Sequence, residues 1–498
     1  MISIIKTNLP IFVVIIPLFI AVLLPVLSRR IKLVEGLVIS TETIWLLAAG
    51  YLASIVLLQS GIPIIYNLGG WVAPWGIELK VDSLGAFFLL LVTGISLPVA
   101  LFAKGNLTNE VGSKERVARF YVFLLLLGGA LVGMAVTNDL FNVYVLVEVA
   151  TLSCCALVSS RNYPRAAEAA FKYLILATLG STFILCGIGF IYMLTGHLNM
   201  GFAHQELIQV WQNSTHVIWV AMSFTLIGFG VKSALFPLHV WLPDAHSSAP
   251  TPASAILSGL AVKGYIICFI KFMYSVFGQN LMIQFNIHRI LILAGMIAII
   301  AASIFALSQK ELKRRLAFST VAQVGYIFMG LGLLNTTGLT GTLFYLASHA
   351  VIKSSLFLAG GAMLAATGKK KISDLSGIGR KMPITMAVFT IGSLGLIGIP
   401  LFSGFIGKWY MLRGSLESGN ILSVIVIILG SVLCAAYLLP IIRIAYFEPG
   451  TEEDLHDPGL SQKIALIILA VAVVILGIIP GPILELARRA ATELLMIQ

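Results

Sequence analysis

This sequence has little charge. Only 11% of its 498 residues are Asp, Glu, Lys or Arg, whereas 59% are hydrophobic, and the mean hydropathy is +1.00. A soluble domain carries about 25% charged residues, so this composition excludes a soluble globular protein and indicates a polytopic membrane protein. The net charge of +11 is spread over short clusters between apolar runs, which is typical of membrane-protein loops and not of a nucleic-acid-binding patch.

Cysteine and histidine are also scarce. His349 is the only histidine expected in mid-membrane, whereas a haem in a helix bundle uses paired axial ligands. We therefore expect no metal site, no cofactor and no redox or hydrolytic centre in this chain. Whether the chain is part of an enzyme is left open, because it depends on the subunits with which it assembles. The cysteines lie scattered in apolar runs without CxxC spacing, against a disulfide framework or an iron–sulfur cluster: Cys154, Cys155, Cys186, Cys268 and Cys434.

Long apolar runs are abundant. A helix needs about 20 apolar residues to cross a bilayer, and the first run lacks a small-residue cleavage site, so we expect it to be retained as a helix. The runs predict an all-α polytopic membrane protein with about fourteen transmembrane helices, near residues 9–28, 33–58, 83–103, 118–136, 140–160, 165–195, 216–238, 252–278, 287–307, 312–335, 338–366, 384–416, 420–446 and 462–483.

The basic residues indicate which loops share a side. When alternate loops are assigned to one side, most Lys and Arg fall together. We therefore expect the basic loops in the cytoplasm, both termini outside and the protein in the cytoplasmic membrane. The outer loop 60–82 predicts a short hairpin at the interface, whereas the inner loop 447–460 is acidic and its role stays open. The outer side has little beyond Lys6, Lys80, Arg289, Arg488 and Arg489.

Two spans are interrupted and each carries one lysine. The seventh breaks around Phe236–Leu238 and carries Lys232, and the twelfth breaks around Gly398–Leu401 and carries Lys408. Interrupted helices at matching positions in two halves point to an inverted repeat with an ion site near the midplane. We predict two inverted five-helix repeats with broken helices 7 and 12, and these divisions: helices 1–3 with the outer hairpin in 1–117, the repeats in 118–278 and 279–446, and the acidic loop and last helix in 447–498.

Glu148 and Lys232 are the first candidate functional pair. Glu148 is the only charged residue of the fifth span, and intramembrane carboxylates are rare without a role. We predict that Glu148 faces Lys232 and keeps it protonated, and that separation of the pair lets the lysine release its proton. The alternative is a neutral, hydrogen-bonded acid that only orders the helices.

Further lysines and one histidine lie in the later spans. Lys263 lies about midway along the eighth span, whereas Lys271 is expected to snorkel to the interface. His349 and Lys353 are spaced i, i+4 and share one helical face. Because imidazole exchanges a proton near neutral pH, we favour a relay over a packing histidine. At Lys408 we favour a relay over an interfacial anchor, since nearby glycines leave room for water or a close neighbour.

Five stretches, taken in order, resemble one family over nearly the whole chain. They are similar to the antiporter-like membrane subunits shared by respiratory complex I, Mrp-type multisubunit Na+/H+ antiporters and energy-converting membrane hydrogenases. The resemblance implies an ion-translocation axis through Glu148, Lys232, Lys263, His349 and Lys408. The stretches read NDLFNVYVLVEVATLSCCALV, FGVKSALFPLHVWLPDAHSSAPTPASAILSGLAVK, ELKRRLAFSTVAQVGYIFMG, LFYLASHAVIKSSLFLAGG and GIPLFSGFIGKWYML.

The features that separate the branches of this family are mixed. A lysine at 408 and the outer hairpin resemble the Mrp D subunit and its hydrogenase relative, whereas HVWLPDAHSSAPTPAS, with His239, Asp244 and His246, is more similar to complex I or hydrogenase subunits. The resemblance implies a proton-translocating subunit of a respiratory or membrane-bound hydrogenase-like complex. His239, Asp244, His246 and Lys353 are candidate accessory groups of the axis.

Other functions stay open beside this one. The first alternative is the D subunit of a Mrp-type Na+/H+ antiporter without a redox partner, and another is a stand-alone carrier. The implied partners are other membrane subunits, the lipid bilayer and H+, with no nucleic acid. Na+ is left open because it needs several convergent oxygen ligands that a sequence does not reveal.

Overall fold

The computed structural model describes residues 2–59, 62–449 and 455–497. Its first half contains α1 (Ile2–Leu23), η1 (Leu24–Leu27), α2 (Ile31–Leu58), β1 (Ile64–Asn67), η2 (Leu68–Gly70), β2 (Glu78–Val81), α3 (Ser83–Val111), α4 (Lys114–Val136), α5 (Leu140–Ser159), α6 (Pro164–Thr195), α7 (Met200–Val210), α8 (Thr215–Lys232), α9 (Trp241–Ser248), α10 (Thr251–Ile256), η3 (Leu257–Ala261), α11 (Val262–Ile270), η4 (Lys271–Phe277) and α12 (Gly278–Gln284).

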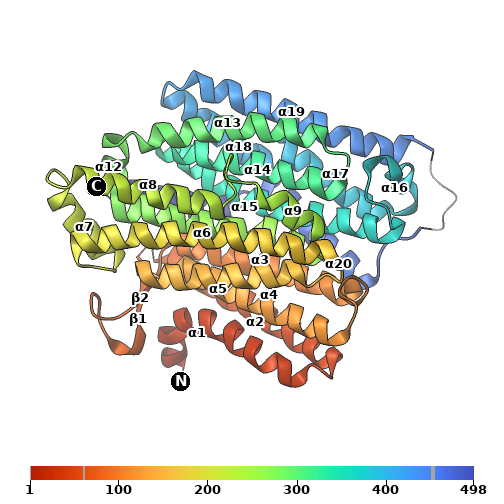
Figure 1. The fold of residues 1–498 in the computed structure, drawn as a ribbon, viewed down its shortest axis with the longest axis horizontal. Helices are drawn as coiled ribbons and strands as arrows, with labels where there is room; N and C mark the ends of the chain where they lie inside the picture. The colour runs from red at the N-terminus through yellow and green to blue at the C-terminus, as the bar shows by residue number, and fades with distance from the viewer. Residues whose placement is uncertain (1, 60–61, 450–454, 498) are drawn as a thin grey trace.

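The second half contains α13 (Ile287–Ser308), α14 (Leu312–Leu331), α15 (Thr336–Thr367), η5 (Ile372–Leu375), α16 (Ile378–Lys381), α17 (Pro383–Ile397), α18 (Ser403–Glu417), α19 (Ile421–Phe447), α20 (Leu460–Ile478) and α21 (Gly481–Met496). The long helices lie side by side along one axis (Figure 1). The hairpin, α7 and α12 are at the left end of that view, and α16 is at the right end.

In the described part of the chain, 12 helices are long and apolar enough to cross a membrane. This confirms the prediction of an all-α polytopic membrane protein. The two further predicted spans differ in character: α14 has 20 residues but begins with a Lys-Arg-Arg run, and the twelfth span is divided into α17 and α18, of 15 residues each. The predicted hairpin is present as β1 and β2, which pair antiparallel with Ile64 opposite Val81.

Polar side chains define where several of these helices begin. The carboxylate of Asp82 accepts a hydrogen bond from the backbone N–H of Gly85 at the start of α3, and Asp139 accepts one from Asn142 at the start of α5. These N-cap bonds satisfy backbone N–H groups that have no partner within the helix. Helix α15 ends at Gly368 with a φ of 67°, a conformation that glycine adopts without strain.

Loops predicted to share a side lie together. At one end, the N–H of Asn162 donates to the carbonyl of Glu110, and the N–H of Leu312 donates to that of Lys370. We call this the basic end. At the opposite end, the N–H of Leu140 donates to the carbonyl of Leu198. The chain therefore alternates between two ends as its loop charges predict.

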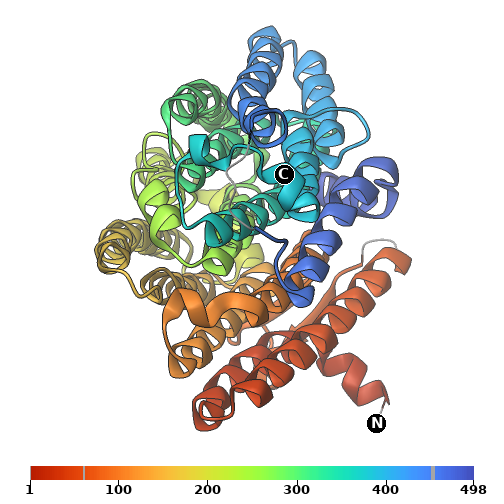
Figure 2. The ribbon, with the colours of Figure 1, turned by 90° about the vertical axis from the view of Figure 1, so that its right-hand side faces the viewer.

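The most buried span is Thr251–Gln284, in which the whole of the most apolar stretch is buried inside the protein. It consists of α10, the π-helical turn η3, α11, a second π-helical turn η4, and α12. Figure 2 looks along the bundle from its end and places the red helices α1 and α2 at the lower edge and blue α19 at the upper edge.

The last two helices return to the first half of the chain. Helices α20 and α21 pack against both α3 and α15. The hydroxyl of Ser83, at the start of α3, donates to the carboxylate of Glu493 in α21 over 2.5 Å. The last two helices therefore join α3, in the first quarter of the chain, to α15 in the second half.

Candidate ion-translocation site

Lys232 and Glu148 lie next to each other inside the bundle. Lys232 is the last residue of α8, its side chain is fully buried, and its Nζ lies 4.0 Å from Oε1 of Glu148 in α5. The same Nζ donates a hydrogen bond of 2.5 Å to the hydroxyl of Thr151, also in α5. Oε1 of Glu148 has no hydrogen-bond partner. The ammonium of Lys232 therefore has two neighbouring acceptors, a carboxylate that it does not hydrogen-bond and a neutral hydroxyl that it does.

Two tyrosines complete this first cluster. The ammonium of Lys232 lies 5.6 Å from the ring centre of Tyr265 in α11, within the range of a cation–π contact. The hydroxyl of Tyr265 lies 3.5 Å from those of Thr151 and Tyr173. These residues could not be predicted from the sequence, because a hydroxyl in an apolar run has no local pattern that marks it.

Lys263 is held by its own helix. It is fully buried, and its ammonium donates to the backbone carbonyl of Ser258, which lies in the π-helical turn η3. Wider helical turns of this kind occur often at functional sites. The hydroxyl of Ser258 lies 2.8 Å from that of Thr320 in α14, which extends the polar contacts of Lys263 into the second half of the chain.

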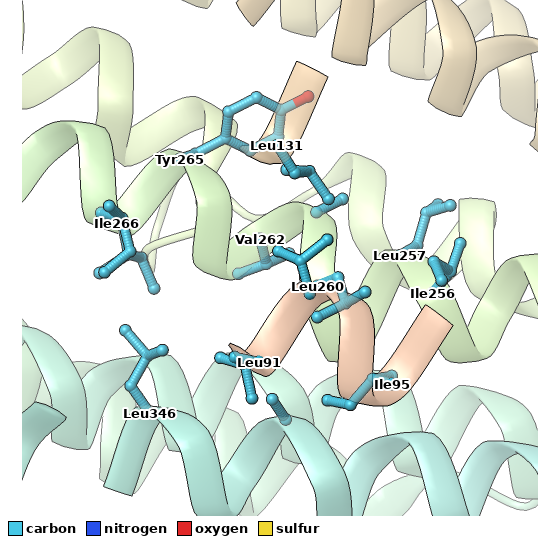
Figure 3. Close-up of a cluster of buried hydrophobic side chains, with 14 of the residues drawn as sticks. Leu91, Ile95, Leu131, Ile256, Leu257, Leu260, Val262, Tyr265, Ile266 and Leu346 are labelled. Carbon is cyan, nitrogen blue, oxygen red and sulfur yellow. The ribbon is translucent and has the colours of Figure 1, made fainter. Parts of the chain in front are cut away.

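Apolar side chains from three other helices surround this region. A buried ammonium without partners is costly in such surroundings, so the Ser258 carbonyl is a required ligand of Lys263. Figure 3 shows the cluster, in which every side chain named here is at most 7% exposed: Leu91 and Ile95 of α3, Leu131 of α4, Leu257, Leu260 and Val262 of the central span, and Leu346 of α15.

Helix α15 carries a ladder of four side chains on one face, Tyr345, His349, Lys353 and Phe357, at intervals of four residues. The rings of Tyr345 and His349 are stacked with centres 6.2 Å apart. Both ring nitrogens of His349 are buried without a hydrogen-bond partner. The ammonium of Lys353 donates to the carbonyl of Leu316, over 2.8 Å, and to the hydroxyl of Ser319, both in α14.

Lys408 lies at the far end of this ladder. Its ammonium donates to the carbonyls of Leu396 and Ile397, over 2.9 and 3.0 Å, and to the hydroxyl of Ser431 over 3.0 Å. These carbonyls end α17 at the break of the twelfth span, so the lysine satisfies backbone groups that the break leaves free. Its Nζ also lies 5.9 Å from the ring centre of Tyr345, which links Lys408 to His349.

The accessory candidates divide into two groups. His246 is fully buried, its ring stacks on Phe357 with centres 4.7 Å apart, and neither nitrogen has a hydrogen-bond partner. It therefore extends the α15 ladder. His239 stacks on Phe236 nearer the surface. Asp244 instead forms ion pairs with Arg314, at 3.0 Å, and Lys172, at 3.8 Å, and belongs to a surface network.

Lys271 does not snorkel, contrary to the prediction. It is 4% exposed, and its ammonium donates to the carbonyls of Ala135 and Thr137 over 2.7 and 2.6 Å. These carbonyls lie at the C-terminal end of α4, which a cation stabilises. Sequence position along its own helix did not reveal this because the partners lie more than 130 residues earlier.

The fold and these buried groups define a class, an α-helical membrane protein with an internal series of glutamate, lysine and histidine side chains. A family profile described as NADH:quinone oxidoreductase/Mrp antiporter, TM, matches residues 137–434. The chain is 36% identical over 492 residues to NADH-quinone oxidoreductase subunit N of Desulforudis audaxviator, which spans 95% of this chain and 96% of that relative.

Two solved structures share the whole fold. One is the membrane-bound sulfane sulfur reductase, an archaeal respiratory membrane complex, with a TM-score of 0.90, 29% identity and coverage of 98% of both chains. The other is the Mrp complex from Dietzia sp., with a TM-score of 0.89, 25% identity and coverage of 98% of this chain and 97% of that one. This chain belongs to the NADH:quinone oxidoreductase/Mrp antiporter membrane-subunit family, as its five motifs predicted.

Proposed function

We propose that this chain is the proton-translocating membrane subunit of a multisubunit respiratory or membrane-bound hydrogenase-like complex. Protons move along an axis formed by Glu148, Lys232, Lys263, His349 and Lys408. The observation that carries the proposal is how these cations are held. Within the residues that the structure describes, Lys263 and Lys408 contact carbonyl and hydroxyl oxygens and no carboxylate, so neither must break an ion pair to release a proton.

Uptake is supported by a cavity of about 460 Å³ at the basic end, which we call the inlet cavity. Thr251 and Glu110 both line it, and the carboxylate of Glu110 accepts the backbone N–H of Thr251 over 2.8 Å. Thr251, Ser254 and Ser258 then follow one face of the central span. Because the Ser258 carbonyl holds Lys263, this series connects the inlet cavity to the axis.

The Glu148–Lys232 pair is suited to act as the gate. Its Nζ–Oε1 distance of 4.0 Å is at the outer limit of an ion pair, while Thr151 holds the ammonium at 2.5 Å. A small shift of Glu148 therefore separates the charges without leaving Lys232 unsolvated. The glutamate side chain is 28% exposed, and a charge facing lipid is costly, which favours a neighbouring subunit that covers it.

The main alternative is the D subunit of a Mrp-type antiporter with no redox partner. The fold matches the Mrp structure nearly as well as the sulfane sulfur reductase, with TM-scores of 0.89 and 0.90. Among the relatives, the identity is 36% with NADH-quinone oxidoreductase subunit N and 31% with a putative antiporter subunit mnhD2 of Staphylococcus aureus. Among the two solved structures, it is 29% with the sulfane sulfur reductase and 25% with the Mrp complex. Subunits that co-purify with the chain distinguish the assemblies, since a redox subunit supports the main proposal and an assembly of antiporter subunits alone supports the alternative.

The proposal is tested with Lys232→Ala and Glu148→Ala in the purified complex, reconstituted into vesicles. Uptake of H+ and of Na+ is measured while the complex turns over. We expect both variants to assemble with their partners and to lose coupled transport. Wild-type transport by an assembled double variant contradicts the proposed axis.

We further propose the cytoplasmic membrane as the location, with the basic end in the cytoplasm and both termini outside, and two inverted repeats in 118–278 and 279–446. Each half carries a lysine beside an interrupted helix, which supports the repeats: Lys232 is the last residue of α8, and Lys408 lies in α18, which follows the break after α17. In a variant without Cys186, a cysteine at Lys369 should react with an impermeant thiol reagent only from the cytoplasmic side, and one at Gln212 only from outside.

A further inference from the structure

A second cavity at the basic end, of about 700 Å³, lies between α4, α5 and α6. We call it the arginine cavity, because Arg116 and Arg119 of α4 and Arg161 of the α5–α6 loop line it. Arg116 is partly engaged, since its guanidinium donates to the side chain of Asn162 over 3.0 Å. Arg119 and Arg161 have no hydrogen bond or ion pair with another side chain in the described part of the chain.

The charge of this cavity is not balanced from within. None of the residues that line it is acidic. By contrast, the inlet cavity contains Glu110 and Glu311, and a third cavity nearby contains Asp244 and Glu168. The carboxylate of Glu115 acts on Arg119 from the solvent side but does not line the arginine cavity. The arginine cavity is therefore suited to an anion, and its planar guanidinium groups favour a phosphate.

The lining also has an apolar part. Phe120 and Phe123 follow the arginines on α4, and Ala156 and Ala167 face them from α5 and α6. Phe123 is only half-buried. A soluble phosphate compound gains nothing from these side chains, whereas a phospholipid places its headgroup among cations and its acyl chains against the apolar run below.

We propose that the arginine cavity binds the headgroup of an anionic phospholipid from the leaflet at the basic end. Arg119 and Arg161 hold the phosphodiester, and an acyl chain lies along the half-buried Phe123. The lipid also contacts the wall of the inlet cavity, because Arg161 and Tyr163 line both cavities. Two cations lie near the Tyr163 ring: the guanidinium of Arg161 is 6.0 Å from the ring centre, and the ammonium of Lys370, which lines the inlet cavity, is 4.9 Å from it.

The test uses the full chain in its native complex, in nanodiscs of phosphatidylcholine with increasing phosphatidylglycerol. Bound phosphatidylglycerol is counted by native mass spectrometry. The double variant Arg119→Gln/Arg161→Gln should bind this lipid about tenfold more weakly than the wild type. The control Lys114→Gln removes a positive charge from the same helix end outside the cavity and should bind within about twofold of wild type. Equal binding by the double variant overturns the proposal.

A second measurement does not depend on removing arginines. A Phe123→Trp variant, with wild-type arginines, is titrated with phosphatidylglycerol brominated in its acyl chains. We expect its additional tryptophan fluorescence to be quenched, and neither glycerophosphate nor inorganic phosphate to prevent the quenching. Absence of quenching overturns the lipid assignment. Full reversal of the quenching by millimolar inorganic phosphate also overturns it, and assigns the cavity to a free anion. Neither result bears on the proton axis, which the Lys232 and Glu148 variants test separately.

Discussion

Single buried lysines in this protein differ in what holds their ammonium groups. Lys232 contacts a carboxylate and a hydroxyl, whereas Lys271 contacts the terminal carbonyls of a helix. The first arrangement has two alternative partners of different charge, so the lysine can respond when one of them moves. The second is a fixed helix cap with equivalent neutral ligands. The two lysines should therefore respond differently to the same substitution.

We predict that Lys271→Met lowers stability but leaves transport per assembled molecule unchanged. The substitution leaves the last carbonyls of α4 without their partner, at about 1–3 kcal/mol for a buried unsatisfied group. Thermal unfolding of the purified protein and vesicle transport measure the two effects. Lys232→Met is the matched comparison and should lose transport. If Lys271→Met stays stable and loses transport, Lys271 belongs to the axis.

We predict that Thr151→Val reduces transport about tenfold, because Lys232 loses its neutral acceptor and a hydrogen bond to a charged group contributes about 1.5–3 kcal/mol. Valine has nearly the shape of threonine, so the packing of α5 is retained. Thr151→Ser keeps the hydroxyl and should transport at close to the wild-type rate. Initial rates in vesicles with matched protein content give the comparison, and equal rates for the valine and serine variants would show that the hydroxyl has no role.

The charged members of the site could be found from sequence, but their neutral partners could not. Glu148 and Lys232 stand out because charge is rare in an apolar run. Thr151 and Tyr345 are residue types that are common in membrane helices, so neither stands out in the sequence. Only the packing of helices that are distant in the sequence brings them next to a lysine. The Lys271 prediction was wrong for the same reason, since its ligands belong to α4.

At the scale of elements, the interrupted twelfth span depends on how closely its two parts approach. A Cβ atom on Gly404, near the start of α18, would lie 1.9 Å from the carbonyl oxygen of Gly395 in α17. A Cβ on Gly407 would lie 2.7 Å from the Cβ of Tyr345. The sequence left two roles open for these glycines, room for water or room for a close neighbour, and the structure shows close packing against neighbouring helices. This packing sets the position of Lys408.

We predict that Gly404→Ala moves α18 away from α17, weakens the contacts of Lys408 with the α17 carbonyls and reduces transport together with thermal stability. Overpacking of this kind costs about 1–3 kcal/mol. Gly94→Ala is the control, because no atom lies within 4 Å of a Cβ at that site in α3. Unfolding temperature and vesicle transport are measured for both. A Gly404→Ala protein with wild-type values would show that the two parts are not in fixed contact.

The existence of the long apolar helices followed from hydropathy, but their internal irregularities did not. Prolines and glycines predicted where the seventh and twelfth spans break. The π-helical turns of the central span have no such marker, because Leu257–Ala261 contains residues that also form ordinary α-helix. The basic Lys-Arg-Arg start of α14 lowers its apolar character, although this helix is almost entirely buried. Its surroundings, and not its own sequence, allow it to lie inside the bundle.

At the scale of the whole molecule, the contact between α21 and α3 joins the last helix to the first half of the chain. Glu493 accepts a hydrogen bond from Ser83, and its burial raises the pKa of this carboxyl above 4.5, with a smaller contribution from the charge of Asp82 and an opposing one from the Ser83 bond. The folded protein therefore keeps this proton at a pH where the unfolded chain has lost it. This stabilisation is full below pH 4.5 and is lost as the pH rises through the raised pKa.

We predict that the docking of α21 weakens as the pH rises above 4.5 towards the raised pKa of Glu493 and that Glu493→Gln removes this pH dependence. Hydrogen exchange of α21 amides, corrected for intrinsic exchange rates, reports the docking. Glu485 in the same helix is the control, because hydrogen bonds from Arg488 and Arg489 lower its pKa to about 2 and keep it ionised throughout. Glu485→Gln should leave the pH dependence intact. The same dependence in the Glu493→Gln protein would assign it to another group.

The complete burial of the span Thr251–Gln284 has a consequence for how the protein is made. This helix carries two lysines, and each costs about 2.5–3.5 kcal/mol at the centre of an isolated membrane helix. The carbonyls that receive Lys271 belong to α4, which the ribosome synthesises earlier, whereas α15, which covers another side, is synthesised later. The newly made helix can therefore pack directly against α4 as it leaves the insertion machinery, without being exposed to lipid on all sides. It stays in this position until α15 and the rest of the second half of the chain pack against its other sides.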